Sequence, residues 1–183
     1  MIETIISNDC TGGAVSHDLG MEFKSPTINL QILPEDYLKF CENLKVYINS
    51  ELYECKEISK DHYLALLRMY GQVPDFPLGL VNDVLVCFQH YETFSEAKAK
   101  WDERKAKVDY EHIGFIFHGD LRYANEAIEF LKLDLPNKLA LTENYKVDGS
   151  VGIYPKPGDN AFCLDGEKLF IVQAYDYDSW RRL

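Results

Sequence analysis

The chain has 183 residues, of which 46% are hydrophobic and 27% charged. These values are typical of globular proteins, and a chain of this length buries enough surface to need no disulfide or metal for its core. Lys and Arg number 19 against 30 Asp and Glu, which gives a formal net charge of -11. Such an acidic surface repels phosphate backbones and anionic lipids, so we expect no nucleic-acid or membrane-surface partner.

The five cysteines are odd in number and lack the spacing of a zinc site. The first residues, Met1 to Ile6, have no basic region and only a short apolar run, unlike a signal peptide. No apolar stretch approaches the ~20 residues of a membrane span. We therefore expect a cytoplasmic protein with free thiols and with no transmembrane segment, metal or cofactor.

The N-terminal half alternates between strand and helix patterns. Short apolar runs predict strands over residues 2–6, 27–33 and 52–58. Helices are predicted over residues 14–19 and 34–48, with a helical pattern again at 63–70. The second helix begins at Pro34, because proline fits the first helical position and the acidic residues after it favour the positive end of the helix dipole.

The C-terminal half continues this alternation. Two apolar runs flank Asn82-Asp83 and predict a hairpin over residues 78–81 and 84–91. Helices are predicted over 94–107 and 121–131, and strands over 113–117 and 138–142. Residues 143–160 are rich in Gly, Pro, Asn and Asp and predict a long loop, and residues 161–183 predict a C-terminal hairpin and tail.

Strands that alternate with helices predict a sheet covered by helices on both faces. The hairpins add antiparallel strands to it. The predicted fold is therefore one three-layer α/β domain over residues 1–183, with a mixed, mostly parallel sheet.

Polar side chains follow several of the predicted strands. In open α/β sheets, ligands bind at the carboxyl ends of the strands, so these side chains mark a candidate site. The candidates for substrate binding are Ser7, Asn8, Gly12, Gly13 and His118.

Cys10 lies in a glycine-rich turn between a predicted strand and a predicted helix. A thiol at a helix N-terminus has a lowered pKa, because the helix dipole favours the thiolate. The backbone amides of Gly12 and Gly13 are candidate oxyanion donors, since glycine leaves room for close approach. The alternative is that Cys10 is a small buried residue and that the glycines serve only the backbone geometry.

A cysteine nucleophile needs a base, which His90 or His118 would supply, with Asp120 or Asn8 orienting the groups. His90 is placed at the end of an apolar strand, and His17 is near enough to Cys10 to be a further candidate base. Two histidines and Asp120 could also hold a metal. A helix cap at Asp120 and a loop position for His118 explain both residues more simply, so no metal site is predicted.

Three further features bear on the substrate. Arg104, on the helix after His90, could pair with a carboxylate or hold an anionic substrate. The glycine turn could cradle a phosphate, but it has neither the Walker nor the dinucleotide pattern. Asp176-Tyr177-Asp178 is the acid-any-acid pattern of metal-dependent sugar transferases, and its place near the C-terminal end favours a solvated turn.

Several segments together resemble one bacterial family. Ser7 to Gly13 is similar to its Ser-Asn-(Asn/Asp)-Cys-x-Gly-Gly start, and Pro34 to Tyr37 to its "PEDY" helix start. The order of Phe76-Pro77-Leu78-Gly79, His90-Tyr91, Trp101 and Arg104 resembles its central block, and Tyr177 to Trp180 its closing segment. The family is domain of unknown function nineteen-nineteen, whose members are often labelled exopolysaccharide or capsular polysaccharide biosynthesis proteins. The resemblance implies a role near cell-surface polysaccharide assembly and provides no mechanism.

The leading hypothesis is an acyltransferase or acyl hydrolase that acts on a sugar or glycan intermediate. Cys10 would be the nucleophile, His90 the base, and Asp120 a third catalytic residue. The alternatives are a glycosyltransferase-like or nucleotide-sugar-binding protein, with the glycine turn facing a diphosphate, and a non-catalytic carbohydrate-binding subunit of an assembly complex.

Overall fold

The computed structural model describes residues 1–183. Its strands and helices alternate along the chain, with one short 3-10 helix, η1. In chain order the elements are β1 (Thr4–Ser7), α1 (Thr11–Asp18), β2 (Gln31–Ile32), α2 (Pro34–Glu42), α3 (Leu44–Asn49), β3 (Leu52–Glu54), α4 (Lys60–Tyr70), β4 (Leu78–Val81), β5 (Val84–Cys87), α5 (Phe94–Lys105), β6 (Ile113–Asp120), η1 (Leu121–Tyr123), α6 (Ala124–Lys132), β7 (Lys138–Glu143), β8 (Val151–Ile153), β9 (Leu164–Asp165), β10 (Lys168–Leu169), α7 (Phe170–Gln173) and α8 (Tyr177–Arg181).

Four strands form a parallel sheet in the order β1-β6-β7-β8. Ser7 at the end of β1 lies opposite Ile116, and Gly119 near the end of β6 lies opposite Thr142. All of β1 and nearly all of β6 is buried. Strands buried on both faces are apolar throughout rather than alternating, and this is the pattern that the sequence carries at both places. The predicted α/β class is confirmed.

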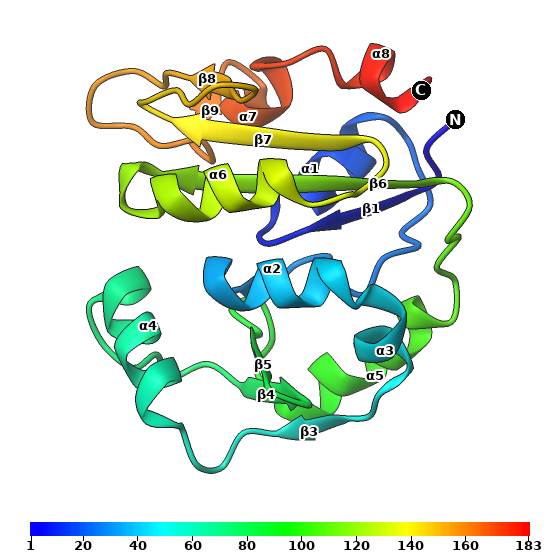
Figure 1. The fold of residues 1–183 in the computed structure, drawn as a ribbon, viewed down its shortest axis with the longest axis vertical. Helices are drawn as coiled ribbons and strands as arrows, with labels where there is room; N and C mark the ends of the chain where they lie inside the picture. The colour runs from blue at the N-terminus through cyan, green and yellow to red at the C-terminus, as the bar shows by residue number, and fades with distance from the viewer.

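Helices cover both faces of this sheet, as Figure 1 shows. α2 and α6 pack on one face, and α1 lies on the other with α7 packed against it. Successive β1 residues therefore enter different cores: Ile6 joins the aromatic cluster that contains Tyr37 of α2, while Ile5 joins a second cluster with Ile171 of α7. This alternation fixes the register of β1 relative to its two helical layers.

The hairpin strands form a separate antiparallel sheet in the order β2-β5-β4-β3, in the lower half of Figure 1. The sequence placed them in the same sheet as the parallel strands. The large aromatic core joins the two sheets, because Ile6 of β1 and Val86 of β5 belong to the same cluster. The two sheets thus meet across α2, and the end of β5 comes near the end of β1.

Several elements differ from their predicted bounds, and three of the differences have a clear local cause or bear on the site. The predicted helix over 34–48 ends at Asn43, whose φ and ψ of -125° and 37° are not helical. The strand predicted over 27–33 shortens to β2, because Asn29 has a φ of 60°, in the left-handed region that a strand cannot contain. The strand predicted over 84–91 ends at Cys87, so His90 lies in a turn.

The last part of the chain returns to the parallel sheet. Residues 143–160 contain the short strand β8 rather than loop alone, and β9 and β10 form the predicted C-terminal hairpin with only two residues each. α8 brings the end of the chain back to its beginning, where the N–H of Ile2 donates to the carbonyl of Arg181 at 2.7 Å. None of the helices combines the length and apolar character that crossing a membrane requires.

Candidate active site

A cavity of about 1150 Å³ opens at the carboxyl end of β1. It lies between the start of α1, the turn after β5 and the C-terminal hairpin with α7. Its volume slightly exceeds the roughly 300–1,000 Å³ range of small-molecule sites. The residues lining it include Asp9, Cys10, Gly13, His17, Asn29, Gln31, Gln89, His90, Phe162, Leu169 and Val172.

The cavity brings the predicted nucleophile and base together. The Sγ atom of Cys10 lies 3.1 Å from Nε2 of His90, and the Gln89 side-chain amide donates to the same Sγ at 3.1 Å. Cys10 caps α1, while His90 and Gln89 come from the turn after β5 in the other sheet. The separation of sulfur and imidazole is within hydrogen-bonding reach, the geometric condition for proton transfer between them.

The Cys10 thiol is protonated at rest. Two effects raise the pKa of Cys10 to about 11: the burial of its thiol, which is the larger, and the negative charge of the nearby Asp9 carboxylate. The hydrogen bond from Gln89 lowers the pKa and offsets only part of this rise. The sequence predicted a lowered pKa from the position of Cys10 at a helix N-terminus, and this prediction is wrong. The helix terminus is present, but burial and a neighbouring negative charge outweigh its field. The pair is thus a thiol beside an imidazole, and the imidazole must take the proton when the sulfur reacts.

Three residues near Cys10, namely Ser7, Asn8 and Gly12, shape the turn and do not line the cavity. Ser7 is fully buried, donates through Oγ to the carbonyl of Asp9 at 2.7 Å, and accepts from the N–H of Gly12 at 3.0 Å. The Asn8 side chain bonds the backbone N–H and carbonyl of His118 on β6. These contacts correct the substrate-binding role predicted for Ser7, Asn8 and Gly12, since their polar groups are already paired inside the protein.

Glycine is required at position 12 by close packing. A Cβ atom on Gly12 would lie 2.5 Å from Oγ of Ser7. Gly13 differs, because it lines the cavity in the first turn of α1, where a Cβ would press on Ile28 and Asn29. Of the two predicted oxyanion donors, only Gly13 remains beside the cavity. Gln89 is a second one, since a side-chain amide next to the nucleophile can stabilise a developing oxyanion.

His118 is buried between two carboxylates behind the cavity. Its Nδ1 lies 2.6 Å from Oδ2 of Asp9, and its Nε2 lies 3.4 Å from Oε2 of Glu143. Burial opposes the charge of the imidazole, but the two carboxylates outweigh it and raise the pKa of His118 to about 9. His118 is therefore a fixed cation that joins β1, β6 and β7. This corrects its predicted place in the substrate pocket, because it does not line the cavity.

Two further predicted residues also serve the scaffold. Asp120 accepts from the backbone N–H of Arg122 at 2.9 Å and pairs with its guanidinium, so it touches neither imidazole and does not complete a catalytic triad. Arg104 is 9% exposed and donates to the carbonyl of Ile28 at 2.9 Å and to Tyr91 Oη at 3.1 Å. It holds the segment beside Asn29 rather than a substrate.

The acidic pattern near the C-terminal end also has a local explanation. Asp176 caps α8 by accepting from the N–H of Ser179, and Asp178 pairs with Arg182.

No group of three or more His, Cys, Asp or Glu side chains has an arrangement suited to a metal ion. The five cysteines are all free thiols.

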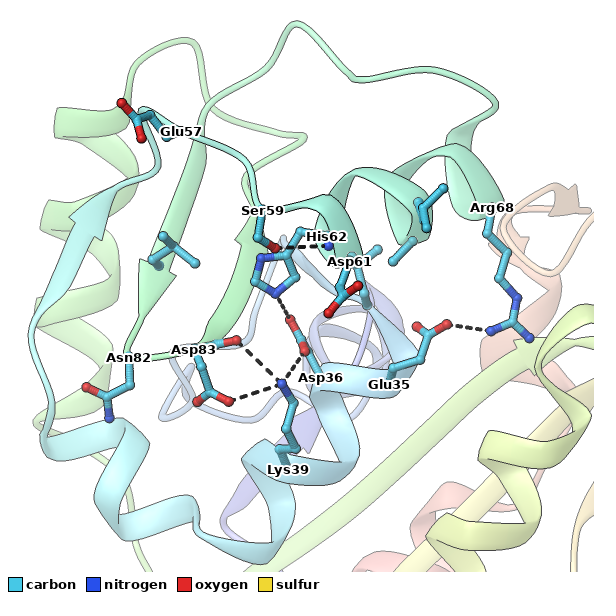
Figure 2. A pocket seen from close by; sticks show the side chains of 14 residues that line it. Glu35, Asp36, Lys39, Glu57, Ser59, Asp61, His62, Arg68, Asn82 and Asp83 are labelled. Carbon is cyan, nitrogen blue, oxygen red and sulfur yellow. Dashed lines mark hydrogen bonds and ion pairs between the residues drawn. The ribbon is translucent and has the colours of Figure 1, made fainter.

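A second cavity of about 680 Å³ lies between α2, α4 and the β4–β5 hairpin, shown in Figure 2. His62 Nε2 lies 2.9 Å from Oδ2 of Asp36, and Lys39 Nζ bridges Oδ1 of Asp36 at 2.7 Å and Oδ2 of Asp83 at 3.2 Å. Arg68 pairs with Glu35 at the other end. Because Asp36, Lys39 and His62 are paired with one another and with Asp83, the network connects α2, α4 and the hairpin.

Four site residues escaped the sequence reasoning. Asp9 lies between the predicted residues Asn8 and Cys10, and Glu143 directly follows the strand predicted over 138–142, so the position of each relative to a strand was a usable signal. Gln89 and Phe162 carry no local signal, because their closeness to Cys10 depends on how the second sheet and the C-terminal hairpin pack.

The fold and this site define an α/β protein with a cysteine-histidine pair at the carboxyl edge of a parallel sheet. The chain belongs to the family described as Domain of unknown function (DUF1919), whose pattern matches residues 2–155. The match confirms the family that the sequence motifs indicated. The chain is also similar to an "Uncharacterized protein" of Haemophilus influenzae, with 27% identity over 110 residues, which is 60% of this chain and 46% of the relative. The chain thus spans just under half the length of that relative.

Proposed function

We propose that this protein is an acyltransferase or acyl hydrolase that acts on a sugar intermediate of cell-surface polysaccharide assembly, with Cys10 as nucleophile. The observation that carries the proposal is the 3.1 Å separation between Cys10 Sγ and His90 Nε2 inside a cavity large enough for a small-molecule substrate. The link to polysaccharide assembly comes from the resemblance of the sequence motifs, and the family description itself states no function. A reducing cytoplasm suits the reaction, since the thiol must stay free.

The first half of the reaction transfers the acyl group to sulfur. His90 Nε2 takes the thiol proton as Cys10 Sγ attacks the carbonyl carbon of a thioester or ester donor. The carbonyl oxygen becomes an oxyanion beside the Gln89 amide and the first turn of α1 at Gly13. The bond from carbon to the leaving group then breaks, and the leaving group takes the proton from His90. The acyl group is now held as a thioester on Cys10.

The second half releases the acyl group. A hydroxyl of the sugar acceptor, or water in a hydrolase, gives its proton to His90 as its oxygen attacks the thioester carbon. The bond between carbon and Cys10 Sγ breaks, and the sulfur recovers the proton from His90. Both halves need the imidazole within reach of the sulfur, and the 3.1 Å separation meets this condition.

A nucleotide-sugar site is less well supported. The N–H groups of Thr11 and Gly12, which would face a diphosphate in a glycine turn, already donate to Asp9 Oδ1 and Ser7 Oγ. The carboxylate of Asp9 borders the same cavity and would repel phosphate. If no acylation of Cys10 occurs, the result favours the alternative of a non-catalytic carbohydrate-binding protein.

The experiment is mass spectrometry of the intact protein after incubation with an acyl thioester, followed by peptide mapping. We expect one acyl group on Cys10 and none in Cys10→Ser, with Cys163→Ser as the matched control that still acylates. Acylation spread over several cysteines, or no covalent product with any acyl donor, would refute the proposal.

A further inference from the structure

The cavity beside Cys10 has two walls of different character. Strand β2 and the turn after β5 supply polar groups, including Gln31, Gln89 and His90. The C-terminal segment, residues 162–172, forms another wall with four apolar side chains, Phe162, Leu164, Leu169 and Val172, and with the charged residues Glu167 and Lys168. A substrate bound here would therefore place its polar part and its apolar part against different walls of the cavity.

The apolar wall is fixed to the buried charges behind the nucleophile. Oε2 of Glu143, which faces His118, accepts from the backbone N–H of Ala161 at 3.3 Å. The ring of Phe162 meets the ring of His118 edge to face, with 5.7 Å between centroids. Because His118 also pairs with Asp9, next to Cys10, one cluster sets the distance between the wall and the nucleophile.

The hairpin also closes over the cavity from the side of α1. Lys168 on β10 forms an ion pair with Asp18 at the end of α1, with 2.5 Å between Nζ and Oδ1. Leu164 on β9 is 69% exposed at the rim, where an apolar side chain gains by covering an apolar ligand. This wall lies beyond residue 155, where the family match ends, so it is a feature that family membership alone does not supply.

We propose that residues 162–172 bind the hydrocarbon chain of the acyl donor, so that the preferred donors carry aliphatic acyl groups of several carbons rather than acetyl. The proposal rests on the acyl-transfer function above and specifies its donor. Each methylene moved from water to an apolar wall strengthens binding by about fourfold. With the carbonyl carbon at Cys10 and the chain along the wall, the polar side of the cavity stays open for the sugar hydroxyl.

The test compares acetyl, butanoyl and octanoyl thioesters of N-acetylcysteamine. We expect the kcat/KM for acylation of Cys10 to rise by about 100-fold or more from acetyl to octanoyl. Val172→Phe fills the space beside the apolar wall. It should remove most of the preference for octanoyl over acetyl, while acetyl transfer persists. Val46→Phe, at an exposed valine on α3 outside the cavity, is the matched control and should keep it. Leu169→Asn provides a second disruption of the wall if the phenylalanine variant does not fold.

Calorimetric binding of the same thioesters to Cys10→Ser separates the two proposals. If octanoyl binds more tightly than acetyl and Val172→Phe removes the difference, the acyl wall is supported even where wild-type Cys10 is not acylated. If all three donors acylate Cys10 at equal rates and binding does not depend on chain length, the proposal that residues 162–172 bind the acyl chain is refuted. The proposal that Cys10 is the nucleophile is then still supported.

Discussion

Replacing His118 by glutamine measures the charge buried behind the active site. The pKa of His118 rises from 6.5 to about 9, because the carboxylates of Asp9 and Glu143 outweigh the burial that opposes its charge. A pKa unit corresponds to about 1.4 kcal/mol, so protonation of this one side chain contributes about 3 kcal/mol to the free energy of unfolding. Since the folded pKa is the higher one, this stabilisation is complete below about pH 6.5 and is lost as the pH rises through about 9.

The assay is urea unfolding of wild type and His118→Gln at intervals from pH 6 to pH 10. Glutamine keeps the backbone groups that bond Asn8. We expect the variant to be less stable at pH 6 by about 3–5 kcal/mol, because it leaves two buried carboxylates without their cation. The difference should shrink by about 3 kcal/mol by pH 10, where the wild type has also lost the charge.

The matched control is His112→Gln, at a half-exposed histidine paired with Asp109 near the start of β6. This variant should stay within about 0.5–1 kcal/mol of wild type across the same pH range. A constant difference between wild type and His118→Gln from pH 6 to pH 10 would refute the assignment of a buried cation.

Three other predictions concern the same elements. Gly12→Ala places a Cβ atom 2.5 Å from Oγ of Ser7, so it should lower the free energy of unfolding by about 1–3 kcal/mol and abolish acylation; unchanged stability and acylation would contradict the packing argument. Because the pKa of Cys10 is about 11 rather than 9, iodoacetamide should label it about tenfold more slowly than free cysteine at pH 8, and rapid selective labelling would indicate a thiolate instead. The hydrogen bond to Asp36 raises the pKa of His62, so His62→Gln should lower the melting temperature by about 2–4 °C at pH 5.5 and by less at pH 8.5, and an equal loss at both pH values would exclude the ion pair.

Local patterns were sufficient for three strands of the parallel sheet, β1, β6 and β7, and for placing Cys10 in the turn between β1 and α1. The apolar runs of β1 and β6 predicted buried strands, and the glycine-rich turn predicted a helix over 14–19, which the structure begins earlier, at Thr11. Both features follow from short stretches of sequence. The prediction that His90 lies near Cys10 agrees with the structure, but its reason, a position at the end of a strand, is incorrect. His90 is not on a strand, and it reaches Cys10 because β5 of a second sheet packs near the end of β1.

The charge state of the site could not be predicted from local sequence. The pKa of Cys10 depends on burial and on Asp9, and that of His118 depends on Glu143, which lies 25 positions further along the chain. Asp120 caps η1, which is the helix-cap role that its position before a predicted helix indicated, whereas Arg104 donates to a backbone carbonyl that no spacing rule identifies. Chain position predicts which groups lie near the sheet edge, whereas packing decides which of them face the cavity.

The most direct test of the account is the rate of Cys10 acylation as a function of pH in wild type and His90→Gln, followed by rapid quench and mass spectrometry. The account predicts fast wild-type acylation at pH 7.5 and a variant slower by about 10²–10⁴-fold, the usual contribution of a general base. The variant should approach the wild-type rate only as the pH nears 11, where Cys10 ionises unaided. Equal rates in the two proteins across this pH range would contradict a role for His90 as the base that activates Cys10.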